Sequence, residues 1–121
     1  MYPKDQAALL PEPWGQIMSD DNPPVVVIFR RWRGSNGSDI IALFPELPAD
    51  YQGWLCDAYE HVGQHGGADY QGVIQATTPV TVEEAAPLAR ELERIGYRLK
   101  PLKRASYKHH KARRATARSL R

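Results

Sequence analysis

Five consecutive residues, Val25 to Phe29, constrain the fold most tightly, because all five are β-branched or aromatic. A short run that is apolar on both faces is typical of a central strand in a sheet. A little further on, Asn36-Gly37 is a dipeptide that readily takes the positive φ angles of a type I′ turn. The pattern therefore predicts a β-hairpin, in which residues 39–44 return antiparallel to the first strand.

Two later segments also have the composition of strands. Residues 70–77 contain Val73, Ile74 and Thr77, and Pro79 follows them. Residues 97–102 alternate between apolar and basic side chains and are predicted to form the last strand. The glycine-rich residues 63–67 are predicted to form a loop.

Residues 53–62 fit two kinds of secondary structure. Trp54, Cys56, Ala58 and Val62 alternate with polar residues, as they would on the apolar face of a strand, whereas Leu55, Ala58 and Val62 also have the spacing of a helix. The flanking Gly53 and Gly63 favour the strand, and the helix stays open as an alternative.

One segment has the pattern of an amphipathic helix. Thr81 and Glu84 have the spacing of a capping box, and Gly96 supplies a stop. Pro87 lacks an amide hydrogen, so we expect a kink there or a helix that begins nearer to it. Between these signals lies a stripe of apolar residues at helical spacing: Val82, Ala85, Leu88, Ala89, Leu92 and Ile95.

These segments predict an α+β protein with a small mixed or antiparallel sheet of about four to five strands and one amphipathic helix on one face. A proline-rich N-terminal arm (residues 1–24) precedes the α+β domain (residues 25–103), and a basic C-terminal tail (residues 104–121) follows it. The chain has 121 residues and one cysteine, so we expect a single core without disulfides. No apolar run is long enough to span a membrane and no secretory signal is evident, which predicts a cytoplasmic protein.

Charge is distributed unevenly along the chain. All 14 acidic residues lie within residues 1–97, together with six basic residues, so this stretch has a net charge of −8. Residues 98–121 contain ten basic residues and no acidic residue, a net charge of +10. Such asymmetry is typical of a tail that binds a polyanion. The ten expected nucleic-acid-binding residues are Arg98, Lys100, Lys103, Arg104, Lys108, Lys111, Arg113, Arg114, Arg118 and Arg121.

The tail from Ala105 onward contains good helix formers but no apolar stripe that would dock a helix on the domain. We expect it to be unstructured in the free protein and helical on a polyanion, as arginine-rich segments often are. Arg30 to Arg33 interleave cations with Trp32, a second and weaker candidate for contact with nucleic acid.

Residues 56–69 concentrate the side chains that could perform catalysis. His61 and His65 could bind a divalent cation with Asp57 as a third ligand, but only if the segment is helical, because residues four apart then share one face of the helix. Asp69 is a further acidic residue of this segment. On a strand they could instead act as acid and base. A structural role is the alternative for all of them, and for Cys56, which has the environment of a small core residue. The common nucleotide-binding, zinc-finger and hydrolase motifs are absent, and no cofactor or metal is expected.

Residues 39–50, with His61 to Gly66 and Ala68 to Tyr70, resemble a group of small proteins of bacteriophages and other mobile elements. The resemblance covers about residues 25–102. That group has no assigned activity, so the resemblance implies a mobile-element protein without implying a mechanism or catalytic residues. Together with the basic tail, this resemblance makes a nonspecific DNA- or RNA-binding accessory protein the first prediction. The alternatives are a protein whose acidic body binds and modulates a host protein or ribonucleoprotein, and a metal-dependent phosphodiesterase that uses His61 and His65.

Overall fold

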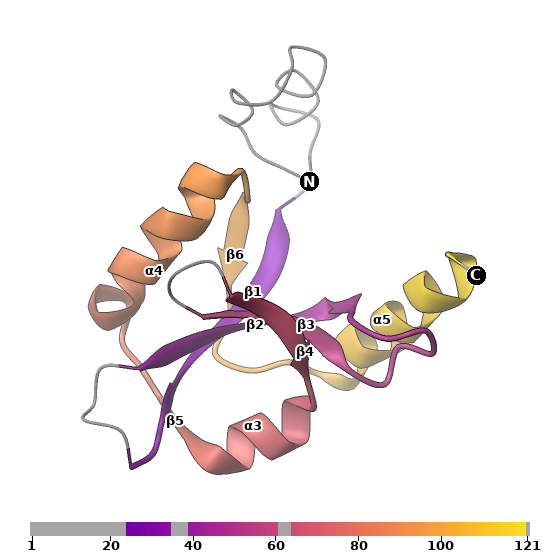
Figure 1. The fold of residues 1–121 in the computed structure, drawn as a ribbon, viewed down its shortest axis with the longest axis horizontal. Helices are drawn as coiled ribbons and strands as arrows, with labels where there is room; N and C mark the ends of the chain where they lie inside the picture. Colours follow the sequence, from indigo (N-terminus) through magenta and orange to yellow (C-terminus); the bar gives the residue numbers. More distant parts are fainter. Residues whose placement is uncertain (1–23, 35–38, 61–63, 121) are drawn as a thin grey trace. The chain divides into compact units, whose positions relative to one another are not determined.

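The computed structural model describes residues 24–34, 39–60 and 64–120, which form six strands and three helices. The predicted α+β class is confirmed, with more elements than the four to five strands and one helix expected from sequence. The predicted arm up to Pro23 and the Asn36-Gly37 turn lie outside the described residues. In chain order the elements are β1 (Val25–Trp32), β2 (Ile40–Pro48), β3 (Cys56–Glu60), β4 (Gln64–Ala68), α3 (Tyr70–Ala76), β5 (Thr77–Pro79), α4 (Val82–Ile95), β6 (Leu99–Pro101) and α5 (Tyr107–Ser119) (Figure 1).

The chain divides into two compact units. Among the described residues, the α4 unit contains residues 24–25 and Val82–Lys100, and the sheet unit contains residues 26–34, 39–60, 64–81 and 101–120. The described part of the predicted basic tail, residues 104–120, thus belongs to the same unit as the sheet. None of the helices in the described part of the chain is long and apolar enough to cross a membrane.

The strands follow the order β4-β3-β2-β1-β5, and each neighbouring pair is antiparallel. The predicted hairpin is confirmed, because Ile28 pairs with Leu43 and Arg31 pairs with Ile40. Strand β6 pairs with β1 outside this order. The segment 53–62 is a strand rather than a helix over Cys56–Glu60, as its flanking glycines indicate.

One face of this sheet forms the core of the sheet unit. Alternate residues of β1, β2 and β3 contribute to it, and Tyr70 and Val73 of α3 pack against them. Figure 1 shows α3 lying against the sheet, next to the end of β4. The buried members are Val26, Ile28, Ile41, Leu43, Cys56, Ala58, Ala68, Tyr70 and Val73.

Two local predictions are wrong. Residues 70–77, expected to be a strand, form helix α3 and the first residue of β5. Tyr70, Val73 and Thr77 have the three- and four-residue spacing of a helix face, and all three are buried. Residues 64–68, expected to lie largely in a loop, form β4, an edge strand in which Gly66 pairs with Ala58. This strand is defined by its backbone pairing with β3. Its glycines have no side chain that could produce an alternating pattern in the sequence.

The predicted amphipathic helix is confirmed as α4, and it buries Ala85, Leu88 and Leu92. Pro87 lies inside it and is exposed. Gly96 ends the helix with a φ of 127°, a conformation that favours glycine, and its amide donates to the Leu92 carbonyl.

Candidate functional site

The basic C-terminal segment is an ordered helix in the free protein, which differs from the expected unstructured tail. Helix α5 packs against β2 within the sheet unit (Figure 1). Its buried residues are His109, Arg113 and Ala117, which are four residues apart and therefore share one face. This face contains a cation and an imidazole, so no apolar stripe revealed it in the sequence.

Arg113 anchors α5. Its side chain is only 4% exposed, and it donates from Nε to the Gly53 carbonyl at 2.8 Å and from Nη1 to the Pro45 carbonyl at 2.9 Å. A longer contact joins Nη2 to the Trp54 carbonyl at 3.4 Å. Pro45 lies where the register between β2 and β3 shifts, which leaves its carbonyl available to the guanidinium. The helix is thus docked by charge-assisted hydrogen bonds to backbone carbonyls.

Gly53 permits this close approach. Its φ is +81°, and a Cβ atom there would lie 2.9 Å from the Cβ of Ala117 and 3.0 Å from the Cα of Arg114. The turn between β2 and β3 therefore requires glycine for both its backbone conformation and the space it leaves for α5.

The two histidines of the segment have structural roles. His109 Nδ1 accepts a hydrogen bond from the Ser106 amide at 2.9 Å, which closes a capping box at the start of α5. His110 Nδ1 lies 2.8 Å from Arg113 Nη1 and accepts from it, and its ring lies edge-on to Tyr70 at 4.8 Å. Burial, and then the neighbouring charge of Arg113, lower the pKa of His110, which suits its role as a neutral acceptor.

The opposite side of α5 is basic. Lys108, Lys111 and Arg118 are exposed, and Arg114 borders them at half burial. These four residues, which we call the basic face, lie on the surface turned away from Arg113, because each residue of a helix advances by about 100°. No carboxylate occurs anywhere in residues 98–121.

The ten predicted nucleic-acid-binding residues have different positions. Four form the basic face, and Lys103 and Arg104 are exposed in the segment just before α5. Arg98 and Lys100 are exposed in the α4 unit. Arg113 is buried, and Arg121 lies outside the described residues. Six of the ten therefore belong to the sheet unit and are exposed or half-buried, whereas Arg113 points into the interior.

An exposed indole lies beside the basic face, although its alternation with Cys56 and Ala58 predicts a place on the apolar face of a strand. Trp54 is 58% exposed, and the guanidinium carbon of Arg114 lies 5.1 Å from its ring centroid. The adjacent Tyr51 is also exposed. The alternation is misleading here because β3 begins only at Cys56, so Trp54 lies in the turn that docks against α5.

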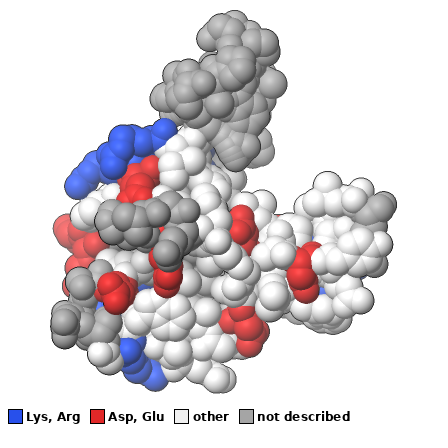
Figure 2. Space-filling view, viewed as in Figure 1, with Lys and Arg blue, Asp and Glu red and all other residues white. Residues whose placement is uncertain are grey.

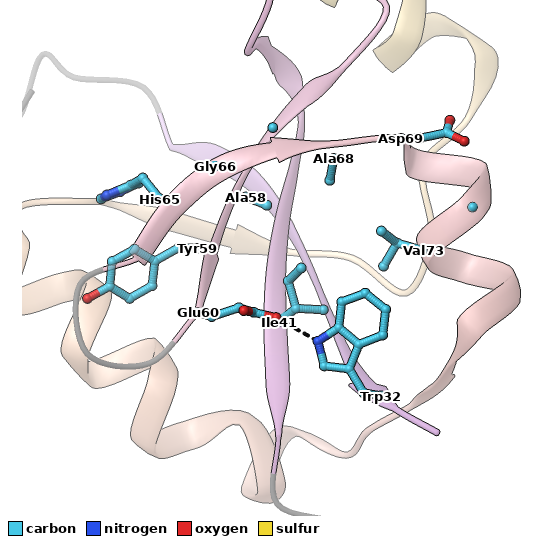
Figure 3. A pocket seen from close by; sticks show the side chains of 12 residues that line it. Trp32, Ile41, Ala58, Tyr59, Glu60, His65, Gly66, Ala68, Asp69 and Val73 are labelled. Carbon is cyan, nitrogen blue, oxygen red and sulfur yellow. Dashed lines mark hydrogen bonds between the residues drawn. The ribbon is translucent and has the colours of Figure 1, made fainter. Parts of the chain in front are cut away.

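The sheet unit also contains an open cavity of about 480 Å³ on the core face of the sheet (Figure 3). Trp32 and Glu60 lie at its centre, with Ile41, Ala58 and Val73 around them. The Trp32 indole donates to Glu60 Oε2 at 2.6 Å, which satisfies the indole N–H. In Figure 3 the side chains of His65 and Asp69 lie at opposite ends of β4, and both point away from this centre.

Of the candidate catalytic residues, the structure describes Asp57, His65 and Asp69, and it brings Asp57 within electrostatic range of His65. His65 packs its ring against Tyr59 at 4.6 Å, and in the described ranges no three His, Cys, Asp or Glu side chains are grouped to hold a metal ion. Burial raises the pKa of Asp57, with the charge of His65 acting in the opposite direction. His61 lies outside the described residues, so its predicted role is not tested.

Cys56 and the Arg30–Arg33 segment are also engaged in the fold. Burial raises the pKa of the Cys56 thiol to about 11, which keeps it protonated at neutral pH and unsuited to nucleophilic attack. Arg30 donates to the Ile74 and Thr77 carbonyls at 3.1 and 3.0 Å, and Arg33 donates to the Gln75 carbonyl at 2.6 Å. These guanidinium groups satisfy carbonyls at the C-terminal end of α3.

Acidic side chains do not form one continuous surface in the view of Figure 2. In the region of the sheet and α5 drawn there, Asp and Glu stand in separate groups. No family model matches the chain, and no curated protein or solved structure matches it either.

Proposed function

We propose that the protein binds nucleic acid nonspecifically in the cytoplasm, through the basic face of α5 and the adjoining Lys103 and Arg104. The observation that carries this proposal is the separation of cations on α5. Arg113 is used internally, while Lys108, Lys111 and Arg118 stay exposed on the opposite side.

Order in the free protein favours this use of the helix. A disordered basic tail loses conformational entropy when it binds, whereas α5 is already fixed by its contacts with β2 and the Gly53 turn. Phosphates would then meet cations held at the three- and four-residue spacing of one helix face. Contacts of this kind position a protein on the backbone without reading base sequence.

Salt dependence gives the first quantitative expectation. If the six basic residues of this surface each neutralise one phosphate, the log-log slope of affinity against salt is about −4 on a single strand and about −5 on a duplex. Fluorescence anisotropy with labelled oligonucleotides over a series of salt concentrations measures this slope.

The decisive variants remove charge without removing the helix. Lys111→Gln/Arg118→Gln takes two cations from the basic face and should reduce the steepness of the slope by about 1.4 on a single strand and 1.8 on a duplex. Arg90→Gln/Arg94→Gln is the matched control, because it removes two exposed cations from α4. It should leave affinity within about twofold, because neither residue belongs to the basic face.

Deletion of residues 104–121 is not a substitute for these variants, because it also removes Arg113 and leaves the Gly53 and Pro45 carbonyls without their donor. Equal losses in both double variants would contradict the proposal. So would a full-length protein that binds no oligonucleotide at low salt, and a search for a protein partner of the acidic body would then follow.

A further inference from the structure

The surroundings of α5 suggest which form of nucleic acid binds. Trp54 is held in place from two directions: its indole Nε1 donates to Gln52 Oε1 at 2.9 Å, and its own carbonyl lies 3.4 Å from the guanidinium of the buried Arg113. Despite these contacts, 58% of the residue is exposed. A large aromatic surface is therefore fixed in position and accessible to solvent.

This indole adjoins the basic face. The Arg114 guanidinium lies over the ring at 5.1 Å from its centroid, a cation–π contact. Arg114 is three residues from Lys111 and four from Arg118, so all three side chains are neighbours on the helix surface. A nucleic-acid backbone that follows these cations passes within reach of Trp54.

A second exposed aromatic side chain lies on the same side of the helix. Tyr107 begins α5, is 69% exposed, and precedes Lys111 by four residues. It is seven residues, or about 10 Å along the helix axis, from Arg114. Tyr107, Lys111, Arg114 and Arg118 thus form one row, with an aromatic ring at one end and Trp54 beside Arg114.

We propose that this surface binds single-stranded nucleic acid more tightly than a duplex, because bases of a single strand stack on Trp54 and, more weakly, on Tyr107 while phosphates contact the basic face. This inference rests on the proposed function. A cationic path with interspersed aromatic rings is the arrangement by which proteins hold single strands without sequence preference, since every base has a stacking face. In a duplex the base faces are already stacked, and only phosphates remain available to this surface.

The test compares oligodeoxythymidine, an unstructured single strand, with a DNA duplex of the same length, titrated at the same salt concentration. Trp54→Ala should weaken single-strand binding about 5- to 100-fold and change duplex binding by less than about twofold. Trp54→Phe is the matched control, because it keeps an aromatic face and should retain most of the single-strand affinity. Tyr107→Ala should show the same selectivity with a smaller loss.

Trp54 is exposed, so Trp54→Ala should keep the urea midpoint of the wild-type protein, and this measurement accompanies the titrations. A second readout follows stacking directly: oligodeoxythymidine should quench the fluorescence of the wild-type protein more than that of Trp54→Phe. The same titrations with oligouridine show whether RNA binds as well as DNA.

The outcomes separate this inference from the proposed function. Equal loss of single-strand and duplex binding in Trp54→Ala, or no loss in either, overturns the single-strand inference and leaves the proposed function standing if Lys111→Gln/Arg118→Gln still weakens both. Absence of binding by the wild-type protein overturns both proposals.

Discussion

Helices α4 and α5 are of nearly equal length but bury side chains of different chemistry. Helix α4 buries Ala85, Leu88 and Leu92, an apolar stripe of the kind that stabilises most surface helices. Helix α5 buries His109, Arg113 and Ala117, so the largest side chain on its buried face is a guanidinium. The stripe of α4 is apolar, whereas the face of α5 packed on β2 also makes hydrogen bonds to backbone carbonyls.

The difference shows when a basic segment can pack against a domain. Burying a charge is costly unless its donors are satisfied, and a guanidinium has several donors in a fixed plane. The Gly53 turn and the register shift at Pro45 provide the matching carbonyls. A lysine in the same place has one ammonium group and could not reproduce this fork.

We expect the largest loss of stability from removing the Arg113 guanidinium. Arg113→Met keeps an unbranched side chain but leaves the Gly53 and Pro45 carbonyls without their donor, and each buried unsatisfied polar group costs about 1 to 3 kcal/mol. We expect the free energy of unfolding to fall by about 3 to 5 kcal/mol, as measured by urea denaturation. Arg113→Lys, which keeps the charge and a single donor nitrogen, should lose less.

A distinctive result accompanies this loss. Because α5 detaches from the Gly53 turn, the circular dichroism signal of helix should decrease at urea concentrations that leave the wild-type protein folded. If Arg113→Met were as stable as the wild type, the carbonyl contacts would not be what docks the helix.

The corresponding change in α4 should have a smaller effect and a different chemical dependence. Leu92 is fully buried, and Leu92→Ala should cost about 3 kcal/mol through lost hydrophobic contact and a cavity. Leu92→Met nearly conserves volume and should cost less than about 1.5 kcal/mol. Methionine is therefore tolerated at 92 and harmful at 113. Similar losses for the two methionine variants in urea denaturation would remove the contrast between the helices.

This contrast also explains which parts of the fold the sequence predicted. The β1–β2 hairpin and α4 follow from local patterns: a β-branched run at Val25–Phe29 and an apolar stripe between Thr81 and Gly96. Helix α3 was missed because Val73 and Ile74 favour strands in general, and tertiary packing of Tyr70 and Val73 decided the outcome.

The candidate site was predictable only in part. The excess of charge in residues 98–121 is visible in the sequence and singles out the residues of the basic face. It does not distinguish Arg113 from its neighbour Arg114, because their different positions depend on carbonyls about 60 residues away in the chain. Trp54 was missed for the same reason, since it reaches α5 only through the fold.

The smallest expected effect on stability concerns Cys56, whose thiol pKa depends on both burial and the charge of Arg113. Burial raises its pKa from 9.0 to about 11, and the charge of Arg113 acts in the opposite direction. Since the folded state holds this proton more tightly than the unfolded state, the thiol's contribution to stability is complete below pH 9 and is lost as the pH rises toward 11. Wild-type protein should therefore lose stability over this window more steeply than Cys56→Ala, by about 1 kcal/mol per pH unit. Urea denaturation at several pH values measures both curves. Parallel curves would mean that the thiol ionises alike in both states, and that its burial beside the Arg113 anchor has no electrostatic consequence.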